Sequence, residues 1–299
     1  PNGSQRYYIG HVDWTGFNGL VEYTGSDNFS AVVQFGTSSQ TYQWEGFYTA
    51  APSTKSRKIT VDGGYVKGGA NYRMNRNSNI FFNVGQIMRP PSFDGVFPNA
   101  DYDFEEADDI TNESFTSFEL GYGFISSNFK ANINAYHTVW GDRTLRRSTS
   151  IDDQGVRIIY DGVEQTHQGI EAEMTWYPSS RLRIRGMASI GDWKYSKNFD
   201  GDAYFIDNNQ PAGTTGTLYL DGVKIGDAAQ SVLYLGADYK LSSKLSMDLD
   251  IMSFDNLHGR FGPLDSEFNS SNNRGSIKLP SWGTVDLGAT YRFSLLGYD

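Results

Sequence analysis

Hydrophobic and polar residues alternate one by one along most of this chain. In segment 117–125 apolar residues occupy every second position, and a longer alternating run fills 129–139. The pair Ser126-Ser127 separates the two runs. Alternation with a period of two predicts strands with one apolar and one polar face. Two such runs joined by a short polar segment predict a β-hairpin.

The same pattern recurs from one end of the chain to the other. A loop is expected to end at Asn18-Gly19, another is expected from 143 through 155, and a small hairpin is expected at 217–225. The remaining strands are predicted over 20–24, 29–48, 59–73, 80–88, 156–165, 168–176, 181–195, 231–241, 244–254 and 284–293. The central hairpin's runs are about nine to thirteen residues long, close to the nine to eleven that a strand needs to cross a bilayer obliquely.

The connections between these strands alternate in length. Short connections lie near 25, 75, 126, 178 and 242, and long ones lie near 49, 89, 143, 197 and 255. Short turns at one end and long loops at the other are typical of outer-membrane barrels, whereas a soluble β-sandwich has no reason to separate them. The sequence therefore predicts an all-β fold, an antiparallel transmembrane β-barrel.

Composition fits this fold and excludes several alternatives. The chain of 299 residues has no cysteine, 33 glycines and 15% aromatic residues. It contains no apolar run of the roughly eighteen residues that a spanning helix needs, which a barrel does not require because alternate residues face lipid. A net charge of −10 argues against a nucleic-acid partner. Further residues are expected before Pro1 and after Asp299, since a strand-like run lies close to the end.

The polar face of the predicted strands carries charge. Its members are Lys67, Asn71, Arg73, Lys130, Asn132, Glu171, Glu173, Arg183, Arg185, Asp238, Lys240, Asp248, Asp250 and Arg292. Such a face suits water or a plug and not a packed apolar core, so a large barrel is favoured. About eleven or twelve strands are expected in this chain.

Several segments resemble those of TonB-dependent outer-membrane receptors. Their order and spacing over roughly two hundred residues match the C-terminal part of that family's barrel. The segments are QIMRPPSF at 86–93 (R-x-P-S-F), SFELGY at 117–122 (S-x-E-x-G), NINAYHTVWGD at 132–142 (N-x-x-x-Y-x-x-x-W-x-D), GIEAEMTWYP at 169–178 (G-x-E-x-E … P) and LPSWGTVDLGATYRF at 279–293 (P … D-L-x-x-x-Y).

The resemblance implies a barrel of 22 strands in the outer membrane of a Gram-negative bacterium, with its long loops extracellular. Residues 1–299 then form part of one barrel domain, without the N-terminal plug or the final strands. The implied partners are outer-membrane lipid, TonB through the missing N-terminal region, and a surface lipoprotein lid or other subunits of a membrane complex. The implied function is energy-coupled import of a substrate too large or too scarce for porins.

Two other functions stay open at this point. The barrel could be a structural or docking subunit of a larger outer-membrane complex, or it could be a passive porin. The sequence does not identify a substrate: iron chelates, cobalamin, oligosaccharides and peptides are all imported by this family.

Binding residues are expected on the two longest loops, 89–112 and 197–229, because loops on a rigid scaffold carry most binding residues. Both loops combine carboxylates with aromatic rings. The candidate ligand or partner residues are Phe93, Asp101, Tyr102, Asp103, Tyr204 and Asp207. The clustered carboxylates could hold Ca²⁺, but they lack the ordered spacing of an EF-hand. A solvated loop is the better interpretation, and no cofactor is expected.

Catalysis is not expected. Glu171 and Glu173 point to the same face and could act as an acid–base pair, but cross-strand pairing with Arg183 and Arg185 explains them better. No nucleophile elbow, phosphate loop or H-E-x-x-H motif occurs. Two aromatic clusters are expected to form the girdle at the outer membrane interface, or else to stack on a ring-bearing ligand. They comprise Tyr42, Trp44, Phe47 and Tyr48, and Trp193 with Tyr195.

Overall fold

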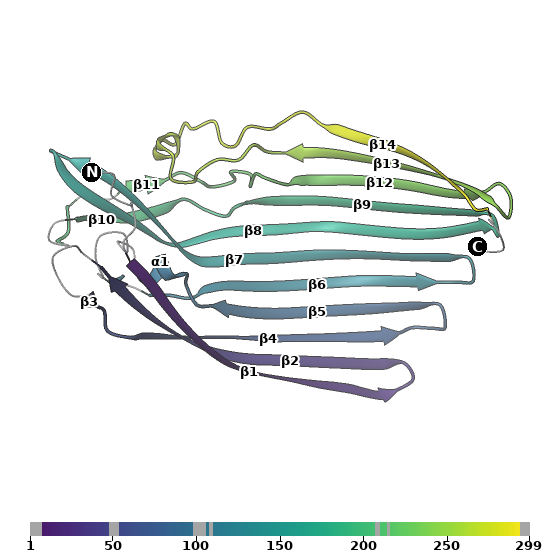
Figure 1. Cartoon of the computed structure of the whole chain (residues 1–299), viewed down its shortest axis with the longest axis horizontal. Helices are drawn as coiled ribbons and strands as arrows, with labels where there is room; N and C mark the ends of the chain where they lie inside the picture. Colours follow the sequence, from purple (N-terminus) through teal and green to yellow (C-terminus); the bar gives the residue numbers. More distant parts are fainter. Residues whose placement is uncertain are drawn as a thin grey trace.

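The computed structural model describes residues 8–47, 54–97, 106–107, 110–206, 210–213 and 216–293. Antiparallel strands form one strongly curved sheet (Figure 1). Its main path runs β1-β2-β4-β5-β6-β7-β8-β9-β12-β13-β14. These strands are β1 (Tyr8–Ser26), β2 (Phe29–Gly46), β4 (Ile59–Arg73), β5 (Ser78–Arg89), β6 (Glu113–Ile125), β7 (Phe129–Ile151), β8 (Gln154–Ser179), β9 (Leu182–Tyr195), β12 (Ala229–Lys240), β13 (Leu245–Leu257) and β14 (Trp282–Tyr291).

The remaining elements are short and lie at one end of the sheet. They are β3 (Thr54–Lys55), β10 (Phe199–Phe205), β11 (Gly216–Leu218), the helix α1 (Phe93–Val96) and a 3₁₀ helix at Ser266–Asn269. Within the described residues, no helix has both the length and the apolar character needed to cross a membrane.

The predicted hairpins at 59–88, 113–142, 168–195 and 231–254 are confirmed. The eleven strands of the main path also agree with the expected number in the part of the chain that is described. The predicted loop ending at Gly19 is wrong, because β1 pairs with β2 from Tyr8 opposite Gly46 to Ser26 opposite Phe29. The Phe35 ring on β2 covers Gly19, and a Cβ there would lie 2.8 Å from it. An aromatic side chain of the neighbouring strand thus fills the space above this glycine, so the strand continues where the sequence pattern predicts that it ends.

The predicted loop at 143–155 is also wrong. There β7 and β8 continue as a hairpin whose turn residues Asp152 and Asp153 have φ of 49° and 62°. Two left-handed residues match the type I′ turn that joins twisted strands most tightly. The expected break near 165–168 is absent, and β10 pairs with β8 and β11 in place of the hairpin expected at 217–225.

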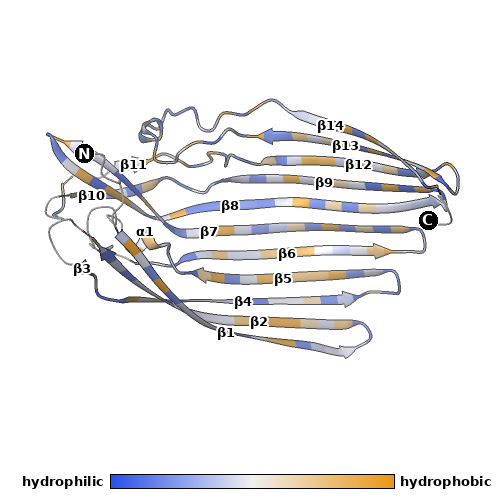
Figure 2. Cartoon of the chain, in the orientation of Figure 1, coloured by the Kyte–Doolittle hydropathy of each residue, from blue (hydrophilic) through white to orange (hydrophobic). Residues whose placement is uncertain are grey.

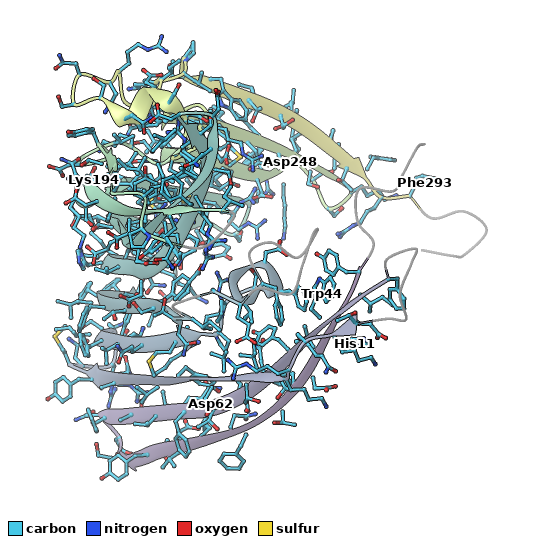
Figure 3. All side chains as sticks on the ribbon, turned by 90° about the vertical axis from the view of Figure 1, so that its left-hand side faces the viewer. His11, Trp44, Asp62, Lys194, Asp248 and Phe293 are labelled. Carbon is cyan, nitrogen blue, oxygen red and sulfur yellow. The ribbon has the colours of Figure 1, made fainter. Side chains whose placement is uncertain are left out.

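The register gives the sheet two chemically different faces (Figure 2). Apolar side chains such as Leu120 (57% exposed) and Ile170 (55%) project from one face. Figure 3 shows Lys194 at the convex side of the sheet and Asp248 on the concave side. Because side chains alternate, the parity of Lys194 places the apolar set, including Ile190, on the convex face. The concave face is the polar one.

The two ends of the sheet differ as predicted, except at the connection expected near 143. Tight hairpin turns lie at one end and the longer connections at the other (Figure 1). We call these the short-turn end and the long-loop end. The tight β7–β8 turn is the exception, because it lies at the same end as the longer connections. Near the short-turn end, aromatic residues on the convex parity recur in strand after strand, as in an interfacial girdle. They are Tyr23, Phe29, Tyr72, Phe129, Trp176, Tyr239 and Tyr291.

Candidate functional site

Helix α1 is held against the concave face at the long-loop end. Tyr42 and Trp44 of β2 are each 1% exposed beneath it, and Phe97 is fully buried. The Tyr42 hydroxyl donates to the Pro91 carbonyl at 2.8 Å, which fixes the chain just before the helix. Tyr42 and Trp44 therefore do not belong to an outer girdle, as the sequence suggested. Their even-numbered positions on β2 place both side chains on the concave face, where α1 covers them.

Next to α1, two arginines and two rings form a compact group on the concave wall. The rings of Phe115 and Trp140 stack with centroids 5.1 Å apart. The Arg143 guanidinium lies 4.0 Å from the Trp140 ring centroid, and Arg89 lies 5.9 Å from it on the same wall. Glu113 accepts from Trp140 Nε1 at 3.1 Å and pairs with Arg89. The group is pre-ordered, since cation–π and hydrogen-bond contacts fix both rings.

A cavity of about 310 Å³ opens between α1 and the start of the β7–β8 extension. Its polar lining comes from three separate elements. It includes Ser92, Asp94, Thr111, Glu113, Asp142, Thr144 and Arg146. Mixed carboxylates, hydroxyls and a guanidinium can hydrogen-bond a polar ligand.

The described residues of the connections 196–228 and 258–281 pack with the ends of β8 and β9 as a second unit at the long-loop end. Its core consists of Tyr160, Val163, Tyr195, Phe199, Leu218, Leu220, Val223 and Phe268. Arg274 binds Glu267 through two hydrogen bonds of 2.7 and 3.0 Å, and these lower the pKa of Glu267 to about 2. Burial lowers the pKa of His258, and the nearby Lys224 and Lys278 lower it further. These connections are therefore braced by hydrophobic and charged contacts.

Nearer the short-turn end of the concave wall, charged side chains form ion pairs from strand to strand, which we call the ladder. Arg185 bridges Asp238 at 3.2 Å and Asp250 at 2.9 Å. The expected pairing of Glu171 and Glu173 with the β9 arginines is wrong: Glu173 accepts from Asn132 at 2.9 Å. The arginines turn to β12 and β13, whose carboxylates stand directly beside them in register. The ladder is a structural feature, and it provides no acid–base pair.

The six candidate residues expected from the sequence lie in different parts of the molecule. Phe93 opens α1 and packs against Tyr8 and Phe97, with ring centroids 5.9 and 5.0 Å apart. Tyr204 lies on β10 opposite Arg157, in the packed unit of the other loop. The other four, Asp101, Tyr102, Asp103 and Asp207, lie outside the described residues.

Trp140 and Arg143 were not among the candidate residues expected from the sequence. The signal that could have found them is the pair of aromatic residues on the polar parity, Phe115 and Trp140, where alternation predicts polar side chains. Across the described ranges, no three His, Asp or Glu side chains gather in a way that would hold a metal ion.

Comparisons with known proteins agree with this architecture. The chain matches the family described as "TonB dependent receptor-like, beta-barrel" over residues 2–298. No curated protein matches the sequence. Similar solved structures include the siderophore receptor PiuA from Acinetobacter baumannii, at 12% identity and a TM-score of 0.68 over 96% of this chain and 38% of that one.

Two further structures share the fold at similarly low identity. The ferric-catecholate import receptor Fiu from E. coli K12 is 11% identical with a TM-score of 0.58, covering 96% of this chain and 39% of that one. The outer membrane transporter YddB from Escherichia coli is 11% identical with a TM-score of 0.57, covering 95% and 48%. The chain thus spans less than half the length of each. From the family match across 2–298, the chain belongs to the TonB-dependent receptor β-barrel family of the Gram-negative outer membrane.

Proposed function

We propose that the protein containing this chain is an outer-membrane receptor for TonB-coupled import, and that its ligand is recognised at the long-loop end. The observation that carries the proposal is the pairing of an apolar convex face with a charged concave face in a chain of this family. An apolar outer surface suits lipid, and a polar inner wall suits a hydrated passage. The long-loop end then faces the outside of the cell.

The ligand contacts are assigned to the concave side of that end. Trp140, Arg143 and the cavity beside α1 combine an ordered ring with polar groups. Asp101, Tyr102 and Asp103 belong to the same connection as α1, and Asp207 to the same connection as Tyr204. These loops are also where a surface lipoprotein lid would sit. The receptors named for siderophores among the similar folds make a ferric chelate the first compound to test.

Uptake by cells carrying the full-length protein tests this function. We would measure entry of a ⁵⁵Fe-labelled ferric catecholate, cyanocobalamin and maltohexaose in the wild type, in a strain lacking TonB and with a protonophore. The expected result is saturable uptake of one compound that disappears without TonB or the proton gradient. Uptake that persists in both conditions, with open-channel conductance in planar bilayers, would establish a passive porin instead. A protein that takes up no compound and is recovered only in a stable complex would favour a docking subunit.

A pair of tryptophan variants tests where the ligand is recognised. Trp140→Ala removes the ring at the candidate site, whereas Trp176→Ala removes a girdle ring on the opposite face. We expect the half-saturation concentration to rise by about tenfold in Trp140→Ala, equivalent to about 1.4 kcal/mol. Equal effects in both variants would place recognition elsewhere.

A further inference from the structure

Strand β7 carries a β-bulge beside the candidate site. In the pairing with β8, Trp140 lies opposite Gln165, and the next matched pair is Arg143 with Val163. Two β7 residues therefore lie between these pairs where β8 has only one. An extra residue of this kind defines a β-bulge, which re-aims the side chains that follow it.

The bulge decides which face of the sheet Arg143 occupies. Trp140 and Arg143 are three positions apart, and a regular strand places such residues on opposite faces. The Arg143 guanidinium instead lies 4.0 Å from the centroid of the Trp140 ring, on the concave wall. The extra residue between them accounts for this, because it shifts the alternation by one position. Without the bulge, Arg143 would point to the convex side, away from the candidate site.

The backbone of Asp142 makes this bulge possible. Asp142 has φ of 57°, in the left-handed region. Aspartate adopts this region far more readily than β-branched residues do. On β8, Gly162 has φ of 64°, and the register shifts a second time between Arg143 and Leu145. The second shift places the extra residue on β8 and restores the pairing, so the hairpin continues in register to its tip.

The bulge brings a guanidinium to the inner wall at the Trp140 ring. Two contacts already cover that ring: Phe115 stacks on it with centroids 5.1 Å apart, and Arg143 lies over it. The Arg143 side chain is half-buried. A guanidinium carries five N–H donors in a planar fork, so a ligand at this wall meets directional donors and not a bare indole face. Arg143 is therefore the residue of this group that can distinguish one ligand from another.

We propose that Asp142 is a positioning residue, whose left-handed backbone brings Arg143 to the ligand side of the wall, and that Arg143 determines specificity there. Only the second part rests on the proposed function, because the first part is a property of the ligand-free protein. Asp142 acts through its backbone conformation. Its carboxylate lines the cavity beside α1 and is not what positions Arg143.

The position of Arg143 is tested by ¹⁹F NMR of the full-length protein labelled with fluorotryptophan, without ligand. The Trp140 signal is the one that Trp140→Phe removes, and Arg143→Gln shows how it shifts when the cation leaves the ring. Asp142→Val should give that same shift, because valine does not tolerate the left-handed region. Asp142→Asn should keep the wild-type signal. Asp153→Val is the matched control: Asp153 has φ of 62° at the tip of the same hairpin, and this variant should also keep the signal.

Specificity is tested by uptake of the ⁵⁵Fe-labelled ferric catecholate, or of cyanocobalamin or maltohexaose where the wild type imports that compound instead. Arg143→Gln should raise the half-saturation concentration about tenfold, as for loss of one charged hydrogen bond. Asp142→Val should raise it by a similar factor. The double variant should be no weaker than Arg143→Gln alone, because one residue acts through the other. Effects that multiply in the double variant would overturn this coupling.

Three NMR results would overturn the positioning role. A wild-type Trp140 signal in Asp142→Val would mean that the bulge does not depend on this residue. A shifted signal in Asp142→Asn would mean that the carboxylate holds Arg143, and a shifted signal in Asp153→Val would mean that any strain in the hairpin disturbs the site. The NMR signal needs no ligand, TonB or gradient, so a failed uptake assay and a failed positioning role are distinguishable.

Discussion

Arg183 on β9 and Asp238 on β12 lie directly opposite each other in the strand register and form a bidentate ion pair. Arg183 Nε and Nη2 donate to the two Asp238 oxygens at 2.9 and 3.0 Å. Arg185 also reaches Asp238, and its other contact, Asp250, accepts from the Tyr234 hydroxyl at 2.5 Å. The concave wall is therefore joined across three strands by side chains as well as by backbone hydrogen bonds. Paired planar groups of this kind give both strength and a fixed register.

Removing the central carboxylate should loosen this part of the wall. Asp238→Asn weakens the contacts to Arg183 and Arg185 together, and we expect a loss of about 1 kcal/mol in the free energy of unfolding, a modest value because the groups are partly exposed. Urea unfolding of the full-length barrel in lipid vesicles measures it. Asp248→Asn is the control: Asp248 stands opposite Asp238 in the register and has like charge. That change should be neutral or slightly stabilising, and a loss equal to that of Asp238→Asn would contradict the ladder.

Glycines on the two faces of the sheet should respond differently to the same substitution. A Cβ on Gly121 would overlap the Phe81 ring on the concave wall, whereas one on Gly68 would make ordinary contacts with the Val32 carbonyl oxygen at 3.6 Å and Val33 Cγ2 at 4.0 Å. Gly121→Val must displace the ring, which costs about 1–3 kcal/mol. Gly68→Val adds an apolar group to the lipid-facing side. Samples are heated to a series of temperatures and run on a denaturing gel, where the folded barrel migrates as a separate band. The temperature at which this band disappears should drop only for Gly121→Val.

The packing of α1 against the sheet should depend on the buried ring of Phe97. Phe97 is fully buried against Val96 and the β2 aromatics, and replacing such a ring with alanine typically costs about 3–5 kcal/mol. We expect Phe97→Ala to release the α1 segment locally while the sheet persists. Hydrogen exchange of residues 93–97 measures the release. Phe81→Ala, far along the same wall, should leave that exchange unchanged, and protection retained in Phe97→Ala would show that other contacts hold the helix.

The loop 258–281 should lose order in acid through one ion pair. Arg274 depresses the pKa of Glu267 from 4.5 to about 2. A depressed carboxyl pKa stabilises the folded loop fully above about pH 4.5, and this stabilisation disappears as pH falls toward 2. The protection factors of amides around the 3₁₀ helix, corrected for the intrinsic exchange rate at each pH, should therefore fall across that window. In Glu267→Gln this fall should be absent, and in Arg274→Gln the Glu267 titration should return toward 4.5.

Single cysteines can establish which end faces outward, because the natural chain has none. A membrane-impermeant maleimide applied to intact cells should label Asp152→Cys at the β7–β8 tip, and also Asp103→Cys and Asn208→Cys. Ser127→Cys and Ser243→Cys, in the short turns, should react only after the outer membrane is opened. The opposite pattern would mean that the long-loop end faces the periplasm.

What the sequence determined by itself was the local alternation and its consequences. Period-two patterning specifies the parity of each strand, so the lipid-facing set, the polar wall and most hairpins follow from side-chain type alone. The difference between short and long connections also required no tertiary information. The family could also be predicted from the sequence, because the segments that resemble it follow one another along the chain, and the family match confirms it.

Only the tertiary structure decided what the inward aromatic residues do. Alternation assigns Tyr42 and Trp44 to a face but cannot show that α1, about fifty residues later, covers them. It also cannot choose the ionic partners of Arg183, since strands on either side could offer carboxylates and the choice depends on register with β12. The continuous β1 depends on Phe35 covering Gly19 from the neighbouring strand. In each case the deciding contact joins residues far apart in sequence, which no local pattern encodes.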